Sequence, residues 1–453
     1  MLAVVIETSS QDVGASCLSP DLCGVSLATL SGFMLVGSKL FVGKSLMVGL
    51  VLAAAHLLVM YSTLCAHVTP LVWFVSLAVI PAVCGGILLV CYSWGRGCFT
   101  VGEGMVVSQL FTIILRRVCE KVFLARSLTE KPGISDVWES QALCFASIVF
   151  VGLTTILTML LLYQWLFSQR PDWLVFYVIH IFVAAFIIMP FLCQYLEANP
   201  FVWLFQYIAH SLKRTLLLSS WFLLSVTAAV IVCSPQLSPS SSVTRKWFHV
   251  LIVAVYVPGL LLDPSFLTLA SVIALAVLVV LEAVRVLCIP PLGCTVDSLF
   301  KAFCDDKDKG AVIVSHIYLL VGLSLPLWLT YSSPHLLQPH KPNIALYSGV
   351  ISVGLGDTAA SVGGSVFGKH RWPGSKKTIE GTSIAILSQL SFILCLSYFG
   401  MGTPESVLSV SVIVISTSVL EGVTSQIDNL ILPLFMYTLF MTTRKQIDTS
   451  ILS

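Results

Sequence analysis

Long apolar segments, separated by short polar connections, run along almost the whole chain. Segments of about 20 mainly apolar residues are long enough to cross the hydrocarbon core of a bilayer as helices. We count about thirteen of them, several short enough to be tilted or re-entrant. They cover residues 22–36, 46–65, 71–92, 143–167, 174–195, 215–233, 250–262, 266–281, 312–331, 344–367, 382–399, 406–420 and 427–441. The pattern predicts an all-α, polytopic bundle of transmembrane helices.

Composition supports the membrane class and removes others. Hydrophobic residues make up 57% of the 453 positions and charged residues only 10%, whereas a soluble domain keeps roughly a quarter of its residues charged. The mean hydropathy is +0.96. A formal net charge of +2 gives no basic surface of the kind that nucleic-acid binding requires. Membrane lipids, and no nucleic acid, are the expected surroundings.

A Ser/Pro-rich connection at residues 234–242 is typical of a boundary between two regions. We therefore expect an N-terminal transmembrane region at residues 1–240 and a C-terminal transmembrane catalytic region at residues 241–453. Nothing in the sequence indicates the oligomeric state.

Four polar connections lie an even number of segments apart and should share one side of the membrane. Their basic residues are Arg245, Lys246, Lys301, Lys307, Lys309, Lys369, Arg371, Lys376 and Lys377. Short loops rich in Lys and Arg prefer the cytosol, so we place this side there. The same count puts Arg444 and Lys445 on the opposite side, so this tail is an exception or one late segment is re-entrant.

Asp357 lies within an apolar segment, where an ionisable side chain is costly unless it has a function. A second interpretation is that Asp357 caps a helix starting at Thr358, because Asp is a good N-cap residue. Downstream, small residues recur every four positions from Gly356 to Gly364. Such a stripe allows close helix packing.

A compact basic turn follows. Residues 363–369 superficially match the start of a P-loop, but His370 replaces the Ser or Thr that binds magnesium, and the context is a membrane helix. We reject that motif. The turn's cations suit a polyphosphate, with glycines such as Gly374 letting backbone N–H groups approach it. The alternative is a positively charged anchor for the flanking spans.

Two further carboxylates, Glu421 and Asp428, are seven residues apart. On a helix they would share one face. Magnesium prefers hard oxygen ligands and usually shares them with phosphates, so these carboxylates fit a metal-bound nucleotide. Alternatively they form structural ion pairs with Lys376 or Lys377.

Three sequence blocks resemble motifs of the dolichol kinases and occur in the same order as in that family. They are Gly356–Ala360, Gly368 to Gly381 with its Arg-Trp-Pro-Gly-Ser-Lys-Lys-Thr core, and Gln426 to Leu430. Arg245 to His249 and Ser315 to Leu320, after the acidic run at residues 305–308, resemble the same family. The resemblance therefore covers roughly residue 245 to the end, and the N-terminal half resembles only generic hydrophobic spans.

This resemblance implies a CTP-dependent kinase of the endoplasmic reticulum membrane. It would phosphorylate the terminal hydroxyl of dolichol or a related polyprenol on the cytosolic face, giving dolichyl phosphate and CDP for protein glycosylation. The expected cofactors are CTP and Mg²⁺ or another divalent cation, and the apolar spans would supply a lateral groove for the polyprenyl tail.

Roles can then be assigned as predictions. We expect Asp357 and Asp428 to bind the metal and Glu380 to orient a lysine or the metal's water shell. No general base is assigned for the alcohol. His316, Asp308 and His249 are the candidates, and of these we include His316 among the predicted catalytic residues. The expected nucleotide-binding residues are Gly356, Lys369, Arg371, Gly374, Ser375, Lys376, Lys377, Thr378 and Glu421.

Other classes remain open. Phosphatidate cytidylyltransferases share a Lys-Lys-Thr-x-Glu-Gly turn but would leave the cytidylyl group on the lipid. Phytol kinases differ mainly in the alcohol. A transporter would explain Asp357 but leave the basic turn without a role, and no inverted repeat supports it.

Overall fold

The computed structural model describes residues 134–167, 170–232, 242–301, 312–331, 343–400, 407–424 and 428–452, with a few positions between 104 and 114. The predicted spans at residues 22–36, 46–65 and 71–92, the acidic run at 305–308 and Gln426 lie outside the described residues. Contacts divide the chain into two units: Met1–Arg117 with Lys309–Val312 and Met441–Ser453, and Val118–Asp308 with Ile313–Phe440. The boundary at residues 240 and 241 stays a prediction.

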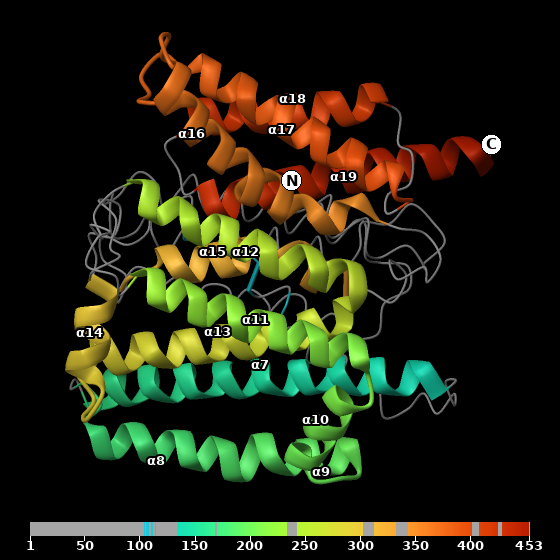
Figure 1. The fold of residues 1–453 in the computed structure, drawn as a ribbon. Coiled ribbons are helices and arrows are strands. Elements are labelled where there is room, and N and C mark those ends of the chain that lie inside the picture. The colour runs from blue at the N-terminus through green and yellow to red at the C-terminus, as the bar shows by residue number, and fades with distance from the viewer. Residues whose placement is uncertain are drawn as a thin grey trace, which may run out of the picture. The chain divides into compact units, whose positions relative to one another are not determined.

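Helices make up nearly all of the described chain (Figure 1). The first half contains α7 (Ile134–Phe167), α8 (Trp173–Val183), the π-helix η3 (Ala184–Ile188), α9 (Met189–Leu196), α10 (Pro200–Ala209), α11 (Leu212–Val232), α12 (Ser242–Leu262), α13 (Pro264–Val286) and α14 (Gly293–Lys301). The second half contains α15 (Ser315–Tyr331), the 3₁₀-helix η5 (Ile344–Tyr347), the π-helix η6 (Val350–Asp357), α16 (Thr358–Phe367), α17 (Ile379–Tyr398), α18 (Val407–Val423) and α19 (Asp428–Leu452). Helices α7 to α18 and the first half of α19 belong to the second unit.

Five helical stretches of the described chain are long and apolar enough to cross a membrane. They are Val137–Leu160, Trp173–Leu196, Pro264–Val286, Ile344–Phe367 and Ile379–Tyr398, and four shorter apolar helices accompany them. The helical class predicted from the sequence is confirmed, and the five apolar stretches fit a multi-pass membrane protein. The count of about thirteen crossings is not confirmed.

Polar residues set several helix starts. Asp172 Oδ1 accepts a hydrogen bond from the Val175 amide at 2.9 Å and so caps α8. Asp263 Oδ1 accepts from the Phe266 amide at 2.9 Å at the start of α13, while its Oδ2 pairs with Arg214 at 2.6 Å. These caps satisfy amides that have no partner inside the helix.

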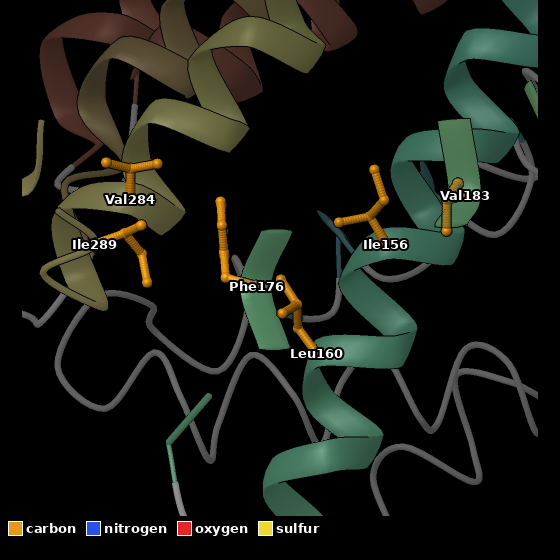
Figure 2. Packing of buried hydrophobic residues seen from close by; sticks show 6 residues of the cluster. All are labelled: Ile156, Leu160, Phe176, Val183, Val284 and Ile289. Carbon is orange, nitrogen blue, oxygen red and sulfur yellow. The ribbon is translucent and has the colours of Figure 1, made fainter. Parts of the chain in front are cut away.

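α7, α8 and α13 lie along one another (Figure 1). Figure 2 shows the apolar cluster between them, formed by Ile156, Leu160, Phe176, Val183, Val284 and Ile289. The outer face of this layer is also apolar: Ile181 is 65% exposed and Phe186 68%. Contiguous exposed apolar surface of this kind is rare in soluble monomers and typical of contact with lipid.

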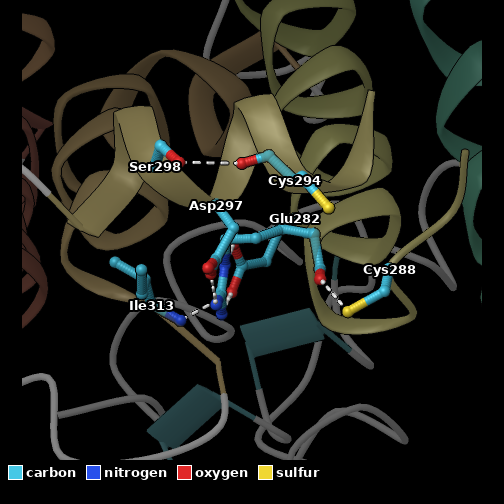
Figure 3. Close-up of polar contacts among 7 residues, drawn as sticks. Glu282, Cys288, Cys294, Asp297, Ser298 and Ile313 are labelled. Carbon is cyan, nitrogen blue, oxygen red and sulfur yellow. Dashed lines mark hydrogen bonds and ion pairs between the residues drawn. The ribbon is translucent and has the colours of Figure 1, made fainter. Parts of the chain in front are cut away.

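A buried ion pair fixes the end of α13. Arg285 donates two hydrogen bonds to Glu282, at 2.9 and 2.7 Å, and a third to Asp297 of α14 at 3.2 Å. Glu282 Oε1 also accepts from the Ile313 amide at 2.6 Å (Figure 3). The cluster therefore ties α13 and α14 to the segment that leads into α15.

Small residues bring α16 and α17 into close contact, as the glycine stripe predicted. A Cβ atom on Gly381 would lie 2.5 Å from the Ala360 carbonyl oxygen and 3.1 Å from the Gly364 Cα. Both neighbours are backbone atoms, so they cannot yield without moving a helix.

Gly381→Ala is therefore expected to destabilise the protein by about 1–3 kcal/mol, the cost typical of overpacking. Thermal unfolding in detergent measures the change, and Ser383→Ala at an exposed position of the same helix is the control. An unchanged midpoint for Gly381→Ala would show that the two helices do not depend on this contact.

Candidate active site

Asp357 ends the π-helix η6 and immediately precedes α16. π-helical turns are rare and occur frequently at functional sites. Among the described residues the Asp357 side chain makes no capping hydrogen bond to α16, so the capping interpretation is not supported. Its Oδ2 instead lies 3.4 Å from Nε2 of His249, on α12.

Three carboxylates converge at this point. Oxygen atoms of Asp357, Glu421 and Asp428 all lie within 4.8 Å of one another. They come from the end of η6, the last turn of α18 and the first turn of α19. Their side chains are 15%, 6% and 13% exposed. Three partly desolvated carboxylates repel one another unless a cation neutralises them.

The donor set suits a divalent cation such as Mg²⁺, which prefers carboxylate oxygens and shares its remaining positions with phosphate or water. Oε2 of Glu421 is buried and accepts no hydrogen bond from the described residues. Buried polar atoms are nearly always satisfied, so this oxygen is available as a ligand atom.

Lys377 supplies positive charge to two of these carboxylates. Its Nζ lies 2.7 Å from Glu421 Oε1 and 2.9 Å from Asp428 Oδ2, and it donates a hydrogen bond to the Glu421 carbonyl at 2.7 Å. Burial acts to lower the pKa of this ammonium, but the negative charges of Asp428 and Glu421 outweigh burial and the pKa is raised. Lys377 is therefore charged at neutral pH, and the ion-pair interpretation holds for it.

The basic turn joins α16 to α17. Arg371 and Thr378 form an antiparallel bridge, and the Trp372 amide donates to the Lys377 carbonyl at 3.0 Å. Gly374, at the tip, has φ of +73°, and a Cβ added there would meet no atom within 4 Å. The backbone conformation, and not lack of space, is what disfavours residues with a Cβ. Thr378 Oγ1 then caps α17 by accepting from the Gly381 amide at 3.2 Å.

Glu380 holds the start of this turn. Its carboxylate accepts hydrogen bonds from the Lys369 amide at 3.1 Å and the His370 amide at 3.1 Å, and contacts His370 Nδ1 at 2.6 Å. Glu380 is not a member of the carboxylate group. Its observed contacts are with the turn's backbone, which was not predicted.

Trp372 is a positioning residue to which the sequence analysis assigned no role of its own. Its Nε1 donates to Thr382 Oγ1 of α17 at 2.9 Å, and a Cβ on Gly422 of α18 would lie 2.6 Å from the same nitrogen. The indole therefore contacts both α17 and α18, the helix that carries Glu421, and fixes the turn against them. An aromatic residue inside an otherwise polar turn was the available signal.

The remaining predicted nucleotide-binding residues lie on the turn, except for Gly356. Lys369, Arg371, Gly374 and Lys376 are exposed on the turn, and Ser375 is half-buried there. Gly356 is buried, and a Cβ at this position would lie 2.7 Å from Gln389 Nε2. This contact gives Gly356 a packing role. Binding roles for all of these residues stay predictions.

The two histidines differ in position. The His316 ring lies 5.7 Å from the Phe300 ring, between centroids, and His316 is not part of the carboxylate group. His249 lies beside Asp357. Both were candidate bases, but only His316 was predicted as a catalytic residue, whereas the fold places His249 beside Asp357. A catalytic role for His316 stays a prediction.

Comparison with known proteins gives a consistent result. The family model described as Dolichol kinase matches residues 42–373. Dolichol kinase of Bos taurus is 34% identical over 367 residues, covering 76% of this chain and 65% of the relative, and the Homo sapiens protein is 33% identical with the same coverage. Dolichol kinase EVAN of Arabidopsis thaliana is 37% identical over 252 residues, covering 53% of this chain and 43% of the relative.

The chain thus spans 65% of the length of the animal relatives. No solved structure shows a significant match. The family match includes Asp357, Lys369 and Arg371 and stops before Lys377. Because it extends over most of the sequence, the chain belongs to the dolichol kinase family.

Proposed function

We propose that this protein is a CTP-dependent dolichol kinase that transfers the γ-phosphoryl group of CTP to the terminal hydroxyl of dolichol. The observation that carries the proposal is the meeting of three carboxylates with a basic turn in one site of a membrane helix bundle. Membership of the family supports the same reaction. The products would be CDP and dolichyl phosphate, which serves protein glycosylation.

Phosphoryl transfer depends on positioning and charge neutralisation more than on covalent catalysis. Asp357, Glu421 and Asp428 would hold a divalent cation, which when bound neutralises charge on the phosphates. Lys369, Arg371 and Lys376 would contact the triphosphate, with Ser375, Gly374 and Thr378 shaping the loop.

Lys377 would have two functions in this reaction: it neutralises carboxylates and contacts the nucleotide. It neutralises Glu421 and Asp428 in the structure described here, and it sits where the basic turn meets the carboxylates. When a nucleotide binds, the Lys377 ammonium would contact its phosphate oxygens at the place where the basic turn meets the carboxylates. The alternative of a purely structural ion pair predicts no contact with the nucleotide.

The three lysines and one arginine of the turn favour the cytosolic side, so we place the active site there. The resemblance to dolichol kinases supports a location in the endoplasmic reticulum membrane. We retain about thirteen crossings and the division at residues 240 and 241 as part of the proposal. Dolichol or a related polyprenol reaches the site within the bilayer, and no nucleic acid takes part.

Labelled nucleotide tests the reaction. Purified protein is incubated with dolichol and with CTP labelled in either the γ or the α phosphate. Label in the lipid from the γ position alone is the expected result. Label from the α position would identify a cytidylyltransferase, and transfer from neither would favour a transporter or a binding protein. Phytol as acceptor tests for a shorter prenol.

Glu380→Gln is expected to raise KM for CTP by about 10–100-fold, the range typical when a residue that orients binding groups is lost. The amide keeps the size of the side chain but weakens the hydrogen bonds from the Lys369 and His370 amides. Steady-state kinetics with varied CTP measure the effect. An effect confined to kcat would contradict the positioning role and favour direct action on the reacting groups.

A further inference from the structure

A cavity of about 450 Å³ lies between α12, the η6–α16 segment and α17. Its wall includes Val253 of α12, Leu355, Ala359 and Gly363 of the central segment, and Ile384 of α17. The volume falls within the range of about 300–1,000 Å³ that is typical of small-molecule pockets. The reaction proposed above assigns none of these residues.

The cavity shares its walls with the carboxylate site. Leu355 and Thr358, which both line it, stand on either side of Asp357 in the chain. Val250, another lining residue, directly follows His249, whose ring contacts Asp357. A molecule in the cavity would therefore have one end beside Asp357.

Exposed apolar side chains form the rim. Val250 is 48% exposed, Val362 53% and Phe367 61%, and all three line the cavity. Val362 and Phe367 belong to a candidate membrane span, where exposed apolar side chains face lipid. The cavity can therefore be entered sideways from the bilayer.

Polar groups in the wall are scarce. Ser388 already donates its hydroxyl to the Ala385 carbonyl at 2.9 Å. Thr358 Oγ1 is buried and has no hydrogen-bond partner among the described residues, although a buried hydroxyl nearly always has one. The wall thus offers one unsatisfied hydroxyl, next in the chain to Asp357, in otherwise apolar surroundings.

We propose that this cavity binds the hydroxyl end of a single-chain isoprenoid alcohol, with the first isoprene units inside and the alcohol beside Thr358 and Asp357. This inference rests on the proposed function and names the lipid subsite of that site. A glycerolipid alcohol is disfavoured, because the one free hydroxyl among the described residues of the wall cannot satisfy both a lipid alcohol and the ester carbonyls, which would be buried without a donor. The cavity therefore selects for a hydrocarbon chain that carries one hydroxyl.

Two valines one turn apart on α16 provide a matched test. Val362 lines the cavity and is 53% exposed, whereas Val366 is 66% exposed and does not line it. Val362→Phe is expected to raise KM for dolichol about tenfold or more, a penalty typical of a misfit in an apolar pocket, with KM for CTP unchanged. Val366→Phe should leave both constants unchanged. Equal effects of the two substitutions would overturn the assignment.

Thr358→Val keeps the shape of the side chain and removes its hydroxyl. Because the hydroxyl would orient the alcohol, kcat with dolichol should fall about tenfold or more, while KM for CTP stays as in the wild type. An unchanged kcat would remove Thr358 from the subsite.

A binding measurement separates this inference from the reaction itself. A prenol with a diazirine on its first isoprene unit is photolysed with the protein in detergent, and the modified peptides are identified by mass spectrometry. Labelling near Val253 and Ile384, reduced by Val362→Phe and competed by dolichol but not by diacylglycerol, is the expected result. Competition by diacylglycerol, or equal labelling by a phospholipid carrying an acyl-chain diazirine, would overturn the selectivity.

The two proposals fail separately. Labelling at the cavity without transfer from γ-labelled CTP would leave the prenol subsite standing and remove the kinase reaction. Transfer from γ-labelled CTP with labelling elsewhere would keep the reaction and overturn this subsite.

Discussion

Asp357→Asn is expected to lower kcat/KM for phosphoryl transfer by about 10²–10³-fold while leaving the protein at least as stable as the wild type. A catalytic metal contributes several kcal/mol of transition-state stabilisation, and each 1.36 kcal/mol is worth about tenfold in rate. Loss of one ligand charge would remove a large share of that contribution.

Unlike the activity, the stability of Asp357→Asn should not fall. Asp357 lies within 4.8 Å of Glu421 and Asp428, and Lys377 is paired with the latter two. Removing the charge of Asp357 therefore reduces repulsion without breaking either of those ion pairs, and the oxygen of Asn can keep the contact with His249 Nε2. Sites that bind charged ligands commonly sacrifice stability for activity in this way.

Kinase assays and thermal unfolding of the same preparations check both halves of this prediction. Asp172→Asn is the matched control, because Asp172 caps α8 and Asn caps helices equally well. Full activity of Asp357→Asn would remove Asp357 from the metal site. Lost activity together with a large loss of stability would indicate a structural role.

Lys377→Met is expected to destabilise the protein by about 2–3 kcal/mol and to abolish most of the activity. Removing one partner of a fully buried ion pair costs about 3–5 kcal/mol, because the other charge is left uncompensated. The Lys377 side chain is 29% exposed, so we expect a smaller loss. Glu421 and Asp428 would then face each other and Asp357 without a cation.

The effect of Mg²⁺ on thermal unfolding distinguishes a metal site from a purely structural ion pair. If the proposed metal site exists, the Lys377 ammonium would compete with the metal for Glu421 and Asp428 in the wild type, and Lys377→Met would remove that competitor. Mg²⁺ without nucleotide should therefore raise the unfolding midpoint more in the variant than in the wild type, since a ligand that binds the folded state stabilises it. Lys376→Met, at the exposed neighbouring position, is the control for stability. Equal shifts in the wild type and Lys377→Met would contradict the competition by Lys377, and no shift in either protein would argue against a metal site.

Local sequence predicted much of the site because its chemistry is concentrated in short stretches. The turn around Gly374 and the stripe from Gly356 to Gly364 were recognisable from residue type and spacing alone. Both depend on backbone conformation or close packing, which glycine permits locally. The structure confirms the close contact of α16 with α17, and it shows a left-handed Gly374 at the tip of the turn, which was not predicted.

Partnerships across the chain were not predictable in the same way. Lys377 was expected to bind phosphate or to pair with a carboxylate, and its distance to Glu421 was needed to establish the pairing. Glu380 was expected to act on a lysine or the metal, but it binds the turn's backbone. Such choices depend on distances of a few ångströms between residues far apart in sequence.

Hydropathy and residue type were enough to predict a helical membrane protein with a polar site in its C-terminal part, because both act over single segments. Which polar groups meet could be learned only from the folded chain. It brought Asp357 to Glu421 and Asp428, selected His249 over His316 as the histidine beside Asp357, and left an apolar cavity on the same wall. Those outcomes depend on how helices pack, and the packing is fixed by contacts between segments that no local pattern records.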